Sequence, residues 1–151
     1  MSRLRIGLAF ATAIVLAATL VRGSAAADPK LFALMTGAQE IPRADPYGHA
    51  RATITLKRTA RRVCFDIRKT GIATAQAGHI HRGVKGHNGP IYVPLFASAR
   101  RGGRITGCAR NVSRMKIDAI TRNPRGFYVN IHTRKYPEGA ARGQLSRTRP
   151  R

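Results

Sequence analysis

The chain has 151 residues, and its 28 lysines and arginines outnumber its 6 aspartates and glutamates, which gives a net charge of +22. Such a charge favours polyanionic partners, for example an anionic cell-wall polymer or an acidic protein, although it can also serve solubility alone. The basic residues are spread along the chain, without an aromatic-lined groove or a nucleic-acid-binding motif, so specific nucleic-acid recognition is not the expected function.

The N-terminal segment predicts export. Residues 1–5 are short and basic, residues 6–21 are apolar or small, and three alanines at 25–27 form a small-residue cleavage site. We expect a cleaved signal peptide over residues 1–27 and a secreted, extracytoplasmic domain over residues 28–151. Removing the three arginines of the signal peptide leaves this domain with a net charge of +19 and no transmembrane segment. An uncleaved membrane anchor is the alternative, but the apolar run is shorter than the about 20 residues of a typical spanning helix.

The first half of the domain predicts three strands. They cover residues 30–36, 48–57 and 62–69, and turn residues separate them. In the second of these strands Ile54 and Leu56 alternate with polar residues, which predicts one buried face and one exposed face. The third strand repeats this alternation after a short turn, so the two strands are expected to form a hairpin.

The second half predicts five more strands and one short helix. The strands contain residues 79–81, 91–97, 105–109, 126–133 and 141–145. Residues 91–97 are apolar at both parities, which predicts a strand covered on both sides. Ser113 is a candidate helix cap, and Met115, Ala119 and Ile120 have helical spacing, so a helix is expected to about residue 121. The last predicted strand ends at residue 145, and residues 146–151 form a basic tail.

Three histidines fall on one predicted face of the sheet. His79 and His81 are two residues apart, so both rings lie on the face opposite Ile80 in a strand. His132 likewise lies opposite its neighbour Ile131. If the two isoleucines face the core, the three histidines share the outward, polar face.

Cys64 and Cys108 are the only cysteines, and only one pairing between them is possible. In an exported protein this pair predicts a disulfide. Cys64 has the opposite parity to its apolar neighbours Val63 and Phe65, which places the disulfide on the outer surface. Closing a loop of about 45 residues would contribute about 4 kcal/mol to stability through chain entropy.

Several short motifs occur together in a characteristic order. They are Thr-Gly-Ala-Gln-Glu-Ile-Pro at 36–42, Gly-His-Ile-His-Arg-Gly at 78–83, Gly-His-Asn-Gly-Pro at 86–90, Tyr-Val-Asn-Ile-His-Thr at 128–133 and Arg-Gly-Gln-Leu at 142–145. In this order and spacing, the chain resembles the CHRD domain over residues 31–145. One departure is visible, because the family commonly has a glutamate at the position of Ala140. Its carboxylate is missing here, or its role has moved to Glu138.

The resemblance implies an all-β domain, an immunoglobulin-like or superoxide-dismutase-like Greek-key β-sandwich or barrel, here with one short helix. It implies a non-catalytic extracytoplasmic binding or structural module with no catalytic residues and no required cofactor. The motif residues are expected to fix strand ends and loops. They are Gly37, Gln39, Glu40, Pro42, Gly83, Asn88, Gly89, Pro90, Asn130, Arg142, Gly143 and Gln144.

The histidines leave three alternatives open. His79, His81 and His132 look like the copper half of a superoxide dismutase site and could bind copper or zinc, with His87 as a candidate fourth ligand. A copper-dependent redox activity is the catalytic version of this hypothesis. In the structural alternative, the rings hydrogen-bond to loops and hold the glycine-rich segment on the sheet.

Overall fold

The computed structural model describes residues 27–149. The predicted signal peptide, residues 1–27, lies outside the described residues except for Ala27. None of the helices formed by residues 27–149 is long and apolar enough to cross a membrane.

Eight strands form one antiparallel sheet, which confirms the all-β prediction. The strands are β1 (Lys30–Thr36), β2 (His49–Lys57), β3 (Arg62–Thr70), β4 (Ala75–Arg82), β5 (Ile91–Phe96), β6 (Arg104–Ala109), β7 (Phe127–Thr133) and β8 (Ala141–Gln144). One α-helix, α1 (Arg114–Arg122), and two 3-10 turns, η1 (Gly37–Gln39) and η2 (Pro124–Gly126), complete the described part of the chain. The order across the sheet is β5-β4-β7-β8-β1-β2-β3-β6.

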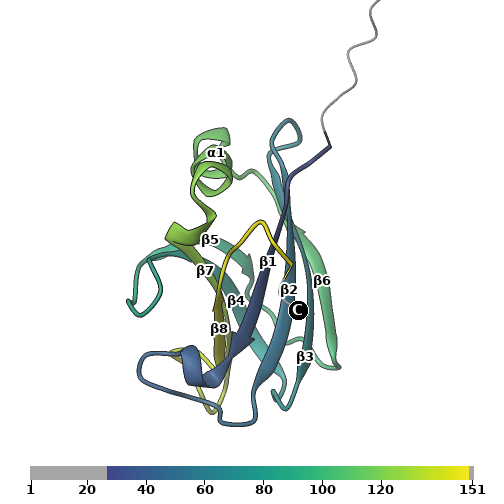
Figure 1. Cartoon of the computed structure of the whole chain (residues 1–151). Helices are drawn as coiled ribbons and strands as arrows, with labels where there is room; N and C mark the ends of the chain where they lie inside the picture. Colours follow the sequence, from purple (N-terminus) through teal and green to yellow (C-terminus); the bar gives the residue numbers. More distant parts are fainter. Residues whose placement is uncertain (1–26, 150–151) are drawn as a thin grey trace, which may run out of the picture.

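The sheet curls until its two outermost strands meet (Figure 1). β5 and β6 lie against each other, and a backbone bridge between Ala75 and Arg100 joins the two sides of the seam. The result is a nearly closed barrel. Because the sheet is curved, the side chains of one parity fill the interior and those of the other parity face outward.

The interior is filled by aliphatic side chains from nearly every element. The largest fully buried ones are Leu31, Met35, Ile54, Leu56, Val63, Ile67, Ile80, Val93, Ile117, Ile120, Ile131 and Leu145. They include Ile54 and Leu56, and the predicted hairpin is present as the pairing of β2 with β3. Ile80 and Ile131 are both 0% exposed, so the three histidines project from the outer face.

The predicted helix is present, but the prediction of its buried face was partly wrong. Ser113 caps α1 by accepting a hydrogen bond from the backbone N–H of Lys116 at 3.3 Å. Ile117 and Ile120 are the buried side chains, whereas Met115 is 79% exposed. The helical spacing of apolar residues was compatible with more than one face, and the packing of Ile117 and Ile120 into the hydrophobic core selected this one.

β5 differs from the sequence prediction of a strand covered on both sides. It is the outermost strand of the order and pairs only with β4, and Ile91 is 52% exposed. Pro94 lies within β5 and has no N–H to donate, which is compatible with an edge position. The proline therefore indicated the edge position of β5 better than the run of apolar residues did.

The disulfide between Cys64 and Cys108 confirms the predicted pairing. The two cysteines are directly opposite each other in the ladder of β3 and β6. Cys108 is exposed and Cys64 is half-buried. The disulfide therefore fastens the outside of the barrel, as the parity of Cys64 predicted.

Candidate metal centre

The structure brings His79, His81 and His132 together on the outer face of β4 and β7. The two strands are paired so that His79 is opposite Asn130 and His132 is opposite Ala77. Each ring offers one nitrogen such that the three nitrogens lie within 4.8 Å of one another. Among residues 27–149 this is the one group of three or more histidine, cysteine or acidic side chains close enough to hold a metal ion.

Hydrogen bonds to backbone carbonyls orient two of the rings. His81 Nδ1 lies 2.8 Å from the carbonyl of Gly89, and His132 Nδ1 lies 2.7 Å from the carbonyl of Pro137. A carbonyl only accepts hydrogen bonds, so Nδ1 carries the proton in both rings. Each neutral ring then has its lone pair on Nε2, which is the form that ligates a metal.

The two Nε2 atoms have different environments. His132 Nε2 lies 2.9 Å from His79 Nδ1 and 3.0 Å from the side-chain oxygen of Asn130. His81 Nε2 is buried and has no hydrogen-bond partner within the described part of the chain. An unpaired buried polar atom costs about 1–3 kcal/mol, so this nitrogen is the least satisfied group of the cluster.

The electrostatics of the cluster favour the neutral forms of His79 and His81. Burial, followed by the neighbouring His132 and His81, lowers the pKa of His79 to about 4. Burial also lowers the pKa of His81, against the raising effects of the Gly89 carbonyl and of the nearby Asn130 side chain, which does not reach hydrogen-bond geometry with His81 Nε2. Neutral imidazoles have free lone pairs, so protons do not compete strongly with a metal at neutral pH.

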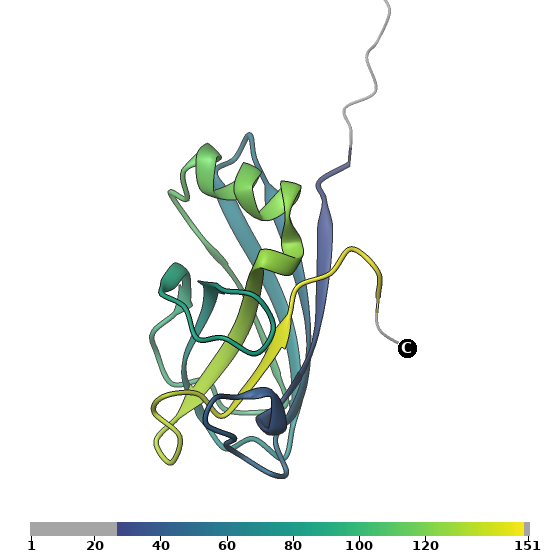
Figure 2. The ribbon, with the colours of Figure 1, turned by 60° about the vertical axis from the view of Figure 1, so that its left-hand side comes forward.

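The face that carries the histidines is much less exposed than its polar residues suggested. His81 is 9% exposed, Tyr128 4% and Asn130 2%. Two loops, residues 37–48 and 83–90, cross the outer side of β7 and β8 (Figure 2). The prediction of an outward face is correct in direction, but the loops cover much of it.

Tyr128 is a site residue that the sequence analysis did not single out. Its ring stacks on His81, with centroids 4.9 Å apart and planes 8° from parallel. Its hydroxyl accepts a hydrogen bond from the backbone N–H of Gly89, whose carbonyl holds His81. The shared parity of Tyr128, Asn130 and His132 was the available signal.

The motif residues hold the covering loops on the barrel. Arg142 Nε donates to the carbonyl of Gln39 at 2.6 Å, and Arg142 Nη1 donates to Asn88 Oδ1 at 2.7 Å. Asn88 Nδ2 in turn donates to the carbonyl of Ile41 at 2.8 Å, which ties the two loops together. Gln144 Nε2 reaches the carbonyls of Gly83, Arg125 and Phe127 at 2.8, 2.7 and 2.9 Å.

Two motif glycines allow close backbone approach. A Cβ on Gly89 would lie 1.8 Å from the carbonyl oxygen of Arg82, and one on Gly143 would lie 2.3 Å from that of Leu34. Neither contact is possible with a side chain. Of the remaining motif residues, Gly37 begins η1, the Ile41–Pro42 peptide bond is cis, and the carbonyl of Pro90 accepts from the backbone N–H of Arg82.

The structure does not place His87 with the other three histidines, and it does not place Glu138 in the interior. His87 is exposed on the covering loop and is not part of the group formed by the other three histidines. Ala140 is 0% exposed, and Glu138 is exposed. The buried carboxylate next to Arg142 is supplied by Glu40, with Oε2 3.9 Å from Arg142 Nε.

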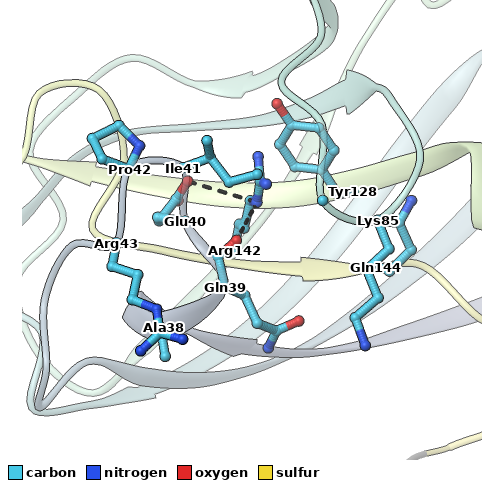
Figure 3. Close-up of a pocket in the computed structure, with 11 residues that line it drawn as sticks. Ala38, Gln39, Glu40, Ile41, Pro42, Arg43, Lys85, Tyr128, Arg142 and Gln144 are labelled. Atoms are coloured by element: carbon cyan, nitrogen blue, oxygen red, sulfur yellow. Dashed lines mark hydrogen bonds and ion pairs between the residues drawn. The ribbon is translucent and has the colours of Figure 1, made fainter.

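A pocket of about 430 Å³ opens beside this network (Figure 3). It is lined by Ala38, Gln39, Glu40, Ile41, Pro42, Arg43, Lys85, Gly86, Tyr128, Arg142 and Gln144. Tyr128 belongs to both places, since it stacks on His81 and lines the pocket. The pocket and the histidine cluster are therefore neighbours on the same outer face.

Residues 31–145 match the family model described as the CHRD domain. No curated protein and no solved structure matches the chain.

Proposed function

Because the chain belongs to the CHRD domain family, we propose that it is an extracytoplasmic binding module whose His79, His81 and His132 bind one copper or zinc ion. The family match and the surface disulfide fit an extracellular protein. Imidazole nitrogen suits both metals, and the only two cysteines are joined to each other, so no thiolate is available.

The unpaired Nε2 of His81 is the observation that carries the proposal. A purely structural role is satisfied by the bond from His81 Nδ1 to Gly89 and leaves the other nitrogen buried without a partner. A metal ion gives that nitrogen a partner. The same bond to Gly89, and its counterpart from His132 to Pro137, then have the role of the outer hydrogen bonds that orient metal-ligating histidines.

Metal analysis of the purified protein tests the proposal. Protein stripped with a chelator is loaded separately with Cu²⁺ and Zn²⁺, and bound metal is measured after desalting. We expect about one ion per chain, and nitrogen hyperfine splitting in the electron paramagnetic resonance spectrum of the copper form.

Single substitutions identify the ligands. His79→Ala and His132→Ala should each weaken metal binding at least about 100-fold, because losing even an outer partner costs 10–100-fold. His49→Ala is the matched control, since His49 is exposed on β2. An unchanged affinity in His87→Ala would show that the loop histidine is not a fourth ligand. Negligible metal content, or binding by His132→Ala equal to that of the parent protein, would refute the proposal.

A second candidate function is electrostatic adhesion to an anionic polymer. Four of the six carboxylates are already paired with basic side chains, in the pairs Asp28–Lys57, Asp118–Arg58, Asp66–Arg104 and Glu40–Arg142. Since basic residues outnumber acidic ones 28 to 6, most of the positive charge has no carboxylate to balance it. This excess favours a polyanionic partner.

A further inference from the structure

The pocket of Figure 3 has a cationic interior of its own, apart from the histidine cluster. The Arg142 side chain is 4% exposed, and its guanidinium lies 4.7 Å from the centre of the Tyr128 ring. Nε donates to Gln39, and Nη1 donates to Asn88. Nη2 is buried and has no hydrogen-bond partner within residues 27–149.

Glu40 lies beside this guanidinium without saturating its donors. Its Oε2 lies 3.9 Å from Arg142 Nε, which is too long for a hydrogen bond. Its Oε1 is also unpartnered and lies toward Gly139, where a Cβ would approach it to 2.4 Å. The N–H groups of Nη2 therefore have no acceptor within the described part of the chain.

The rest of the lining combines positive charge with apolar surface. Arg43 and Lys85 are exposed residues of the two covering loops, so the lining has three cationic side chains against one carboxylate. Ile41, Pro42 and Tyr128 supply apolar walls. A ligand that matches this lining has one anionic group and an apolar body.

We propose that this pocket binds a small organic carboxylate, with the carboxylate at Arg142 Nη2 and the apolar body against Ile41, Pro42 and Tyr128. A planar carboxylate fits a guanidinium whose Nη2 has two N–H groups without an acceptor, and Lys85 adds long-range attraction. An inorganic anion such as phosphate would leave the apolar walls without a partner. The proposal does not require a metal at the histidine cluster.

Isothermal titration with benzoate and its neutral analogue benzamide tests the charge requirement. The full chain is kept in chelator throughout, so that carboxylate binding to a metal cannot contribute. Benzoate should bind at least about tenfold more tightly than benzamide, because a charged hydrogen bond contributes about 1.5–3 kcal/mol. Equal affinities, or a benzoate dissociation constant weaker than about 10 mM, would overturn the proposal.

A matched pair of substitutions tests the location without removing Arg142, which also holds the loops. Ala38→Glu adds a carboxylate to the exposed lining and should weaken benzoate binding at least about tenfold. Ala60→Glu adds the same charge in the exposed β2–β3 turn, at the other end of the barrel (Figure 1), and should leave binding within about twofold. Equal weakening by both variants would show only a general charge effect and would refute a site in this pocket.

Arg142→Met, if it folds, should abolish the preference for benzoate over benzamide, and retention of that preference would also count against the proposal.

Discussion

Replacing both cysteines by alanine should destabilise the protein by about 4 kcal/mol. Cys64 and Cys108 are separated by 44 positions, and the chain-entropy estimate for closing a loop of that length gives about 4 kcal/mol at 25 °C. Little packing is lost, because Cys108 is exposed and Cys64 is only half-buried. The backbone pairing of β3 with β6 remains available in the variant. The change therefore acts mainly by increasing the conformational entropy of the unfolded chain.

Urea unfolding measures this difference. With a slope of about 2 kcal/mol per molar urea, the midpoint of the double variant should lie about 2 M below that of the oxidised protein. A reducing agent should move the parent protein to the same midpoint and leave the variant unchanged. A loss below about 1 kcal/mol would refute the chain-entropy reasoning.

The same variant tests whether the disulfide affects metal binding as well as stability. His79 and His81 lie inside the loop that the disulfide closes, whereas His132 lies outside it. The pairing of β4 with β7, and not the disulfide, sets the distances among the three rings. Metal affinity measured well below the unfolding midpoint should therefore equal that of the parent protein, and a large loss would contradict this account of the site.

Two further predictions concern charge. Burial raises the pKa of Glu40 from 4.5 to about 7, against the lowering effect of Arg142, so the folded state holds a proton that the unfolded state releases. This stabilisation is complete below pH 4.5 and is lost as the pH rises through 7. Relative to Glu40→Gln, the parent protein in chelator should lose up to about 3 kcal/mol between pH 4.5 and 8 in urea titrations, and a pH-independent difference would contradict the assignment. The comparison with Glu40→Gln is needed because His79 also makes stability depend on pH. The pKa of His79 is lowered to about 4, so His79 makes stability rise with pH below 6.5. Retention on an anionic polymer matrix should fall steeply between about 0.05 and 0.5 M salt, and unchanged retention at high salt would exclude electrostatic adhesion.

Local patterns predicted most of the elements because strand and helix periodicities are properties of neighbouring residues. The alternation in β2 and β3 reports which side chains face the core, and the Ser113 cap reports where α1 begins. The same parity placed the three histidines on one face. These predictions needed no knowledge of the distant parts of the chain.

The candidate pocket was not predictable in the same way. Glu40 and Arg142 are about a hundred positions apart, and they meet only because β8 lies beside β1 in the sheet. The burial of Tyr128 depends on two loops that cross its strand, and a loop's path is not encoded in a periodic pattern. Arg142 was recognised as a motif residue, but its unpaired nitrogen became visible only in three dimensions.

By itself, the sequence determined the strands, the single possible disulfide and the common face of the three histidines, because each follows from residue type and spacing. The tertiary structure decided how close the rings are, which of their nitrogens lack a partner, and which polar residues the loops bury. Those properties depend on the register of β4 with β7 and on the closure of the barrel, which bring together residues that no local rule relates.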